Sequence, residues 1–411
     1  MARYTYPEEH ELQRFVQARY RKAWVWQAVF LSSLIIAIIS LTALLLNVVD
    51  GSFGYIAYEF KKDPYTISEK PLDELTRDEL IAILKDNLSR GAYNKLNNEK
   101  AMEERSQSEL YNLVIERIIQ IKTRETYPFF RSLFEKEKIE AEVRENFPDA
   151  RLEFRSWLSP DFLTTPMSSR AEFAGVRTAL LGSLWLVTIA IAFALPVGVG
   201  AAIYLQEYSD KKNIINRIIQ TNINNLAGVP SIVYGMLGLA IFVRTLESLT
   251  SGALFGVTDS NGRTVLSAGL TMGILVLPLV IINAQEAIKA VPDSIRQAAY
   301  GVGATRWQTV WSHVLPNALP GILTGSILAM SRAIGETAPL IIVGASTFIT
   351  VDPQSPFSKF TALPIQIYQW TARAQSEFHN IAAAAIIVLL AMLLTLNATA
   401  ILLRNHFQRR Y

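Results

Sequence analysis

The feature that most constrains this chain is a series of apolar runs, each about as long as a membrane is thick. A helix needs about 20 apolar residues to cross a hydrocarbon core of roughly 30 Å, and a single soluble domain does not carry several such runs. Six segments meet this length, at residues 24–49, 179–205, 226–243, 265–284, 319–342 and 381–403. We therefore expect an all-α membrane protein with six transmembrane helices.

Charged residues are concentrated between the first two spans. Of the 131 positions from Val48 to Thr178, 44 are charged, whereas the remaining 280 positions of the chain hold only 31 charged residues. The first segment is more polar than an average soluble domain, in which about 25% of residues are charged. We expect a tail and first transmembrane helix over residues 1–49, a water-exposed insert over residues 50–170, and a membrane core of five helices over residues 171–411.

Composition excludes several classes of function. The chain has no Cys, which excludes disulfides, Cys-ligated zinc, iron–sulfur clusters and thiol nucleophiles. Its formal net charge of +3 is too small to indicate nucleic-acid binding. It has no Gly-x-x-x-x-Gly-Lys-Ser/Thr loop, so it does not hydrolyse ATP by that route.

The distribution of Lys and Arg predicts the orientation. The two tails and the loops after spans two and four hold 14 of these residues, whereas the short loops on the opposite side hold four. Cytoplasmic loops carry the excess of positive charge, so we expect both termini in the cytoplasm and the insert on the outer side of the plasma membrane. The first span exceeds the length of a signal-peptide core and no small-x-small cleavage site follows it, which favours a membrane anchor.

The insert is expected to be mainly helical. Thr76 and Ser106 each stand three residues before a Glu, the pattern of a capping box, and an apolar-periodic run follows each of them. Gly91 is expected to end the first helix. A third helix is expected over residues 129–146, and together these segments predict a small hairpin or bundle. The segment from Val48 to Thr178 holds 24 acidic and 20 basic residues, which makes it a poor anion receptor.

The loop after span four, residues 285–316, predicts two short helices at an angle. One helix is expected over residues 294–300. Gly301 and Gly303 permit a sharp bend, and a second, amphipathic helix follows as far as Pro316. An interfacial amphipathic segment is the alternative, although it explains the glycine-containing break less well.

This loop resembles the EAA loop of ABC-importer permeases. Gln297-Ala298-Ala299, Gly303 and Leu315-Pro316 match the family pattern, whereas Gln297 replaces its usual Glu and His313 replaces its usual Ile. In the family the short helix docks in a cleft of the ATPase subunit. The resemblance implies that the docking residues here are Ser294, Ile295, Arg296, Gln297, Ala298, Ala299, Gly301, Gly303, Ala304, Thr305 and Arg306.

Further motifs narrow the resemblance to the PstA family, the permease subunits of phosphate ABC importers. The motifs lie at residues 195–208, 225–235 and 331–339, and the similarity covers about residues 170–405. It implies a type I importer permease core, a homologous PstC-like permease chain, a PstB-like ATPase dimer and a PstS-like extracytoplasmic phosphate-binding protein. It also implies that this chain binds no cofactor, because ATP and Mg belong to the ATPase. The long insert departs from the family.

Two charged residues stand out within span five. Arg332 and Glu336 lie four residues apart, so an uninterrupted helix would place both on one face. Because a charge at the bilayer centre costs at least about 2.5–3.5 kcal/mol, such residues face the protein interior and pair. One interpretation is a gate in which Arg332 contacts the anion and Glu336 holds Arg332 in its absence. The alternative is an ion pair that only fixes helix packing.

The sequence thus predicts a translocation subunit, not an enzyme, that forms half of the pathway for inorganic phosphate. A permease for another oxyanion, such as molybdate or sulfate, is the first alternative. A membrane sensor with an outer ligand-binding domain is the second. The six spans argue against it, because a sensor is expected to have one or two.

Overall fold

The computed structural model describes residues 9–68, 70–99, 101–210, 212–257 and 261–408, so parts of both tails counted for the orientation lie outside the described residues. Within these ranges five helices are long and apolar enough to cross a membrane, or up to six if one bent pair counts as a span. The five are α1 (Glu9–Ser52), α8 (Arg177–Ile203), α12 (Val265–Lys289), α15 (Leu315–Gly335) and α18 (Ser376–Gln408). The helix-dominated membrane fold is confirmed.

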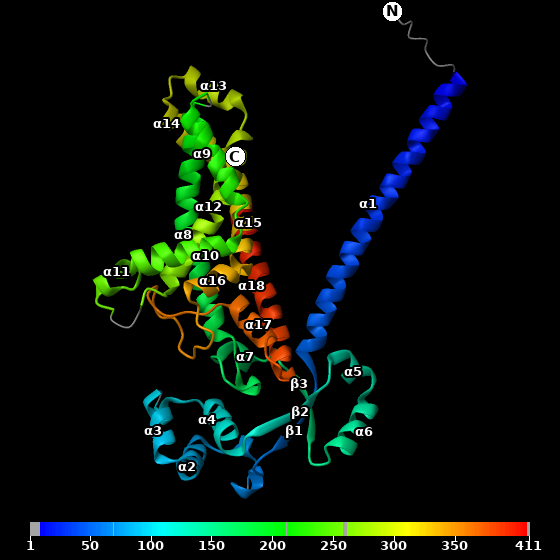
Figure 1. Ribbon diagram of the computed structural model, residues 1–411, viewed down its shortest axis with the longest axis vertical. Helices are drawn as coiled ribbons and strands as arrows, with labels where there is room; N and C mark the ends of the chain where they lie inside the picture. Colours follow the sequence, from blue (N-terminus) through cyan, green and yellow to red (C-terminus); the bar gives the residue numbers. More distant parts are fainter. Residues whose placement is uncertain (1–8, 69, 100, 211, 258–260, 409–411) are drawn as a thin grey trace, which may run out of the picture.

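Helix α12 is the centre of the bundle. It packs along α8 and α15, and 67% of its most apolar stretch of 18 residues is buried. Helix α1 is the opposite case, because none of its corresponding 18-residue stretch is buried. It meets α18 only near its end at Gly51. Figure 1 shows α1 diverging from the bundle, with its start at the same end as α13 and α14. This chain therefore leaves the flank of α1 to lipid or to another protein.

The third span is broken. Residues 226–243 do not form one straight helix, because α9 (Ile214–Ala227) and the segment Ser231–Thr245 meet at an angle of 106°. That second segment consists of α10 (Ser231–Gly238) and a π-helical turn. Pro230 lies at the break, where it lacks an N–H group and disfavours helical backbone in the residue before it. The expectation of an uninterrupted span was wrong at this point.

The fifth span is broken as well. Helix α15 ends at Gly335, Glu336 is extended (φ −78°, ψ 128°), and α16 (Ala338–Val343) follows. In a continuous helix the ring of Pro339 would clash with the carbonyl of Gly335, four residues earlier. The span expected over residues 319–342 is therefore two helices, and Arg332 and Glu336 do not share one helical face.

The remaining shorter helices of the core connect these spans. They are α11 (Glu247–Thr250), α13 (Asp293–Gly301), α14 (Arg306–Thr309) and α17 (Leu363–Thr371). Helix α7 (Pro160–Thr164) is the last helix of the insert. Helices α9, α13 and α14 lie at one end of the bundle, and α17 lies toward the other end, near α7 and the rest of the insert (Figure 1).

Helices of the insert form at the three expected places. They include α2 (Arg77–Asn87), α3 (Arg90–Glu99), α4 (Gln107–Val114), α5 (Phe129–Phe134) and α6 (Lys136–Asn146). Helix α3 was not expected, and the single helix expected over residues 129–146 is divided into α5 and α6 at Glu135. Both capping boxes form, with the side chains of Thr76 and Ser106 accepting from the N–H groups of Glu79 and Glu109. Gly91, expected to end a helix, lies instead in the first turn of α3, because α2 already ends at Asn87.

A three-stranded sheet in the insert was not expected. Its order is β2–β1–β3, with β1 (Phe53–Phe60) antiparallel to both β2 (Ile121–Thr126) and β3 (Arg151–Ser156). The strands come from segments far apart in sequence, and β2 and β3 are rich in charge, so neither has a continuous apolar face. The expectation of a mainly helical insert is confirmed, but the predicted helical hairpin or bundle did not include this sheet.

The insert is anchored on the membrane core. Ile56 of β1 and Phe162 of α7 belong to one buried apolar cluster with Ile381 and Ala385 of α18. Burial of such apolar side chains contributes about 25 cal/mol for each Å² removed from water. The sheet thus continues into the helical bundle instead of forming a separate body.

The helices that follow the two breaks pack against each other. Helix α10 contacts α16, and a Cβ atom added at Gly235 would lie 2.7 Å from the Cα atom of Pro339. Gly235 and Pro339 are both buried, whereas Gly228 and Pro230 at the first break are exposed. Within the protein, neighbouring elements can meet the backbone groups that a break leaves free, and the hydroxyl of Tyr234 donates to the carbonyl of Leu226 at 2.9 Å.

We expect Gly235→Ala to destabilise the chain by about 1–3 kcal/mol, the usual cost of overpacking a tight site, because the obstacle is backbone and cannot rotate away. Gly200→Ala in α8 is the control, because an added Cβ there meets no atom within 4 Å. The measurement is thermal unfolding of the purified chain in detergent. Equal melting temperatures for the two variants would contradict the importance of the contact.

Candidate functional site: the helical elbow and the Arg332–Glu336 pair

The elbow predicted after the fourth span is present. Helix α13 spans Asp293–Gly301, and the chain turns at Gly303, whose φ of +85° is a conformation that favours glycine. Thr305 then caps α14 in a capping box with Gln308. The backbone N–H of Ala304 donates to the carbonyl of Ala299 at 3.0 Å, which closes the bend. The elbow thus has a defined backbone geometry, which Gly303, the capping box and this hydrogen bond determine.

Arg296 holds the elbow against the rest of the core. Its guanidinium contacts Glu207 at 2.7 Å, and it also donates to the carbonyls of Val291 (2.7 Å) and Ile288 (2.9 Å). The side chains of Arg296 and Glu207 are only 13% and 8% exposed. The hydrogen bond to Glu207 raises the pKa of Arg296, which therefore stays charged. Arg296 points into the chain and not outward toward a partner.

Glu207 is the residue that sequence reasoning missed here. It lies in the π-helical turn Tyr204–Tyr208, which continues α8. Although Glu207 is part of the motif at residues 195–208, no spacing rule connects it with Arg296, 89 positions later. Only the fold brings the two together, and their ion pair links the elbow to the end of α8.

The other docking residues divide by exposure. The exposed ones are Ser294, Gln297, Ala298, Gly301, Gly303, Thr305 and Arg306, whereas Ile295 and Ala304 are partly buried and Ala299 is buried. An exposed apolar group adjoins them, in which Val302 is 86% exposed. Trp307 and Trp311 are also exposed and stack with their ring centroids 5.5 Å apart. The outer face of the elbow is thus a mixed polar and apolar surface without a partner in this chain.

Arg332 and Glu336 form a pair across the break after α15. The Nε atom of Arg332 lies 3.4 Å from Oε1 of Glu336, and the two side chains are 41% and 22% exposed. The sequence predicted both residues on one helical face. The helix ends before Glu336, and the two side chains meet because the backbone of Glu336 is extended. Neither side chain is enclosed by this chain, so other molecules have access to both.

Two polar contacts between core helices were not anticipated. Gln220 of α9 and Gln285 of α12 exchange amide hydrogen bonds at 2.7 and 3.2 Å. Ser331, next to Arg332, donates to Asn397 of α18 at 2.9 Å. In an apolar medium such side-chain hydrogen bonds connect helices. Within the residues that the structure describes, no group of three or more His, Asp or Glu is arranged to hold a metal ion.

Comparison with known proteins agrees with this architecture. Residues 194–411 match the family described as binding-protein-dependent transport system inner membrane component. The probable ABC transporter permease protein YqgI of Bacillus subtilis is 31% identical over 56% of this chain and 76% of its own length. The phosphate transport system permease protein PstA 1 of Mycobacterium tuberculosis is 33% identical over 58% of this chain and 74% of its own length.

A third relative is also a permease of a phosphate transport system. The phosphate transport system permease protein PstC of Pasteurella multocida is 31% identical over 47% of this chain and 62% of its own length. More than half of the chain matches the family, and the matched region includes the elbow, the ion pair and both breaks. The chain therefore belongs to the binding-protein-dependent transport system inner membrane components, the multi-pass permease subunits of ABC importers, and is similar to the PstA-type permeases among them.

Proposed function

We propose that this chain is the permease subunit of an ATP-driven importer of inorganic phosphate and forms half of its translocation pathway. The observation that carries the proposal is the Arg332–Glu336 pair, an accessible ion pair at a helix break in a PstA-like chain. The chain itself performs no covalent chemistry and binds no cofactor in this proposal. ATP and Mg act on a separate ATPase.

Arg332 suits a transient contact with phosphate. Its planar guanidinium offers two parallel donors to an oxyanion, and its contact with Glu336 is long enough to be exchanged for a better acceptor. Glu336 holds the guanidinium when no anion is present and repels a second anion. Weak and exchangeable binding fits a pathway that must release what it binds.

The elbow is proposed to couple this movement to the ATPase. The exposed face around Ser294, Gln297 and Val302 would dock on the partner, and the buried Arg296–Glu207 bridge would pass a displacement of α13 to α8. Since Arg296 also holds two carbonyls near the end of α12, a movement of the elbow would move both helices together.

The proposed assembly has four kinds of subunit. A PstC-like permease supplies the second half of the pathway, two PstB-like ATPases dock on the elbows, and a PstS-like protein delivers phosphate to the outer face. The similarity of this chain to both a PstA and a PstC supports pairing of two related permeases. In this arrangement both termini are cytoplasmic and the insert is extracytoplasmic. Nucleic acid has no part in it.

A permease for molybdate or sulfate is the closest rival, since a guanidinium recognises any oxyanion of similar shape. Competition in proteoliposomes separates the two. Excess unlabelled phosphate, and not molybdate or sulfate, is expected to suppress uptake of labelled phosphate. The sensor alternative is disfavoured by membership of the permease family.

We expect Arg332→Gln to lower ATP-dependent uptake of labelled phosphate by about 10- to 100-fold, because the variant loses charge-assisted hydrogen bonds of roughly 1.5–3 kcal/mol. Arg332→Lys keeps the positive charge but lacks the two parallel donors of the guanidinium. Its phosphate uptake should therefore fall between that of the unmodified chain and that of Arg332→Gln. The control is Arg244→Gln, an exposed arginine away from the pair. Normal uptake by an assembled Arg332→Gln complex would refute the proposed gate.

The Arg296–Glu207 bridge is expected to affect coupling more than assembly. Arg296→Gln and Glu207→Gln should each reduce phosphate transported per ATP hydrolysed, and the double variant should lose less than the sum, with a coupling energy of about 1.5–3 kcal/mol. Asp293→Asn is the control, because Asp293 touches the same guanidinium at 3.2 Å but is 85% exposed. Additive losses would contradict an interaction between the two residues. Failure of the ATPase to co-purify would point to a purely structural bridge.

A further inference from the structure

A cavity of about 390 Å³ lies where the insert meets the membrane core. Its walls come from β1, β3, α4, α7 and the turn at Ala171–Phe173, and Ile381 of α18 completes them. Sites for small molecules in proteins usually measure about 300–1,000 Å³ and often lie between domains. The cavity is in the insert and is separate from the elbow and from the Arg332–Glu336 pair.

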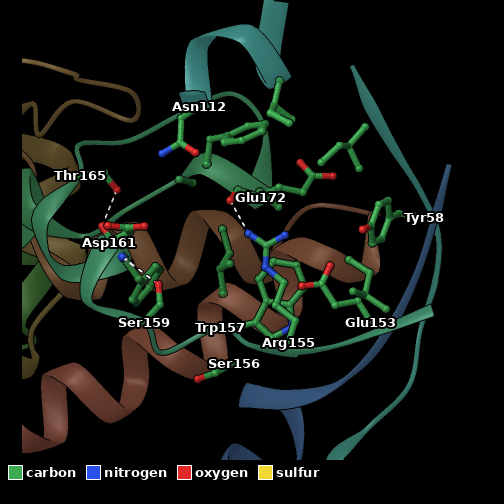
Figure 2. A pocket seen from close by; sticks show the side chains of 18 of the residues that line it. Tyr58, Asn112, Glu153, Arg155, Ser156, Trp157, Ser159, Asp161, Thr165 and Glu172 are labelled. Carbon is green, nitrogen blue, oxygen red and sulfur yellow. Dashed lines mark hydrogen bonds between the residues drawn. The ribbon is translucent and has the colours of Figure 1, made fainter. Parts of the chain in front are cut away.

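Arg155 is the central feature of this cavity. Its guanidinium lies 4.8 Å from the ring centroid of Trp157 and donates one hydrogen bond, at 2.6 Å, to the backbone carbonyl of Glu172. It makes no ion pair among the described residues. Burial lowers its pKa, and the nearby carboxylates of Glu172 and Glu153 oppose this shift. A guanidinium has five N–H donors, so most of those of Arg155 are unused. Figure 2 shows it reaching toward the centre of the cavity.

Three carboxylates line the same cavity. Glu172 accepts from the hydroxyl of Thr123 at 2.9 Å, and burial, together with the negative charge of Glu153, raises the pKa of Tyr58 to about 12. Asp161 lies on the far side from Tyr58 and Glu153 (Figure 2). A carboxylate has about four acceptor positions, so each can accept more donors. With three carboxylates and one guanidinium, the cavity disfavours a free dianion such as phosphate.

We propose that this cavity binds a small zwitterion, a molecule that carries an oxyanion and an ammonium group. The oxyanion would take the unused donors of Arg155, and the ammonium group would lie among the surrounding carboxylates. Such a ligand satisfies the unpaired guanidinium without adding a net negative charge next to Glu153 and Glu172. Free amino acids and the phosphoethanolamine headgroup of a lipid share this chemistry.

The walls favour an apolar body on the ligand. Apolar side chains make up most of the remaining lining, and its aromatic residues include Phe60, Trp157, Phe162 and Phe173. Aromatic rings contribute apolar area and can also stack on a ligand ring. L-Phenylalanine, which combines both charges with such a body, is therefore the first probe.

The experiment is calorimetric titration of the full chain in nanodiscs made without ethanolamine lipids. L-Phenylalanine and O-phosphoethanolamine are the zwitterionic probes, and 3-phenylpropanoate and 2-phenylethylamine each carry one of the two charges. The single-charge probes should bind about 10- to 100-fold more weakly than L-phenylalanine, since each lacks one charge-assisted contact. Inorganic phosphate should give no signal. Binding of O-phosphoethanolamine alone would support the site and identify a lipid headgroup as its ligand.

Variants connect binding to the cavity. Arg155→Gln should weaken binding by about 10- to 100-fold, and Arg155→Lys should weaken it less. Asp161→Asn changes an exposed side chain and so keeps the test available if Arg155→Gln does not fold. The control is Arg144→Gln, an exposed arginine on α6 that does not line the cavity.

The proposal is overturned if neither zwitterion binds at millimolar concentration, if 3-phenylpropanoate binds as well as L-phenylalanine, or if Arg155→Gln and Asp161→Asn both bind like the unmodified chain. Because the titration requires no ATPase and no transport, its result is independent of whether the chain carries phosphate.

Discussion

The structure depends on one constraint, that backbone polar groups in the hydrocarbon core of a membrane must be satisfied within the protein. Long helices meet it alone, whereas a broken helix meets it only where other protein covers the break. The helices that follow the breaks at Pro230 and at Glu336, α10 and α16, cover each other at the contact of Gly235 with Pro339. The charged pair of the proposed pathway is present at the second of these breaks.

The elbow obeys a related rule for charge. A guanidinium that is almost fully buried is stable only when it is paired and hydrogen-bonded, and Arg296 has Glu207 and two carbonyls as partners. This arrangement makes the link between α13, α12 and α8 rigid and leaves the outer face of the elbow exposed. Rigid attachment on one side and an open surface on the other are what a coupling element requires. Arg155 in the insert contrasts with it, since it is similarly shielded but makes no ion pair within the part of the chain that the structure describes.

Much of the fold follows from local sequence. The long apolar helices, the capping boxes at Thr76 and Ser106, and the turn at Gly303 depend on neighbouring residues, so periodicity and residue type predict them. The sheet of the insert could not be predicted in this way, because its strands pair across about 65 to 100 residues and are partly covered by α18. Arg332 and Glu336 were recognised as an interacting pair, although not the break that shapes their contact.

The sequence by itself determined that the chain crosses a membrane several times, which residues form its charged insert, and that a glycine-containing elbow follows the fourth span. These properties depend on transfer of side chains from water and on backbone preferences, and both act within a few residues. Only the tertiary structure decided that Arg296 faces Glu207, that the helices after the two breaks meet, and that Arg155 lies in a cavity with no ion pair among the described residues. Each of these is a contact between segments distant in sequence, which arises only when the whole chain packs.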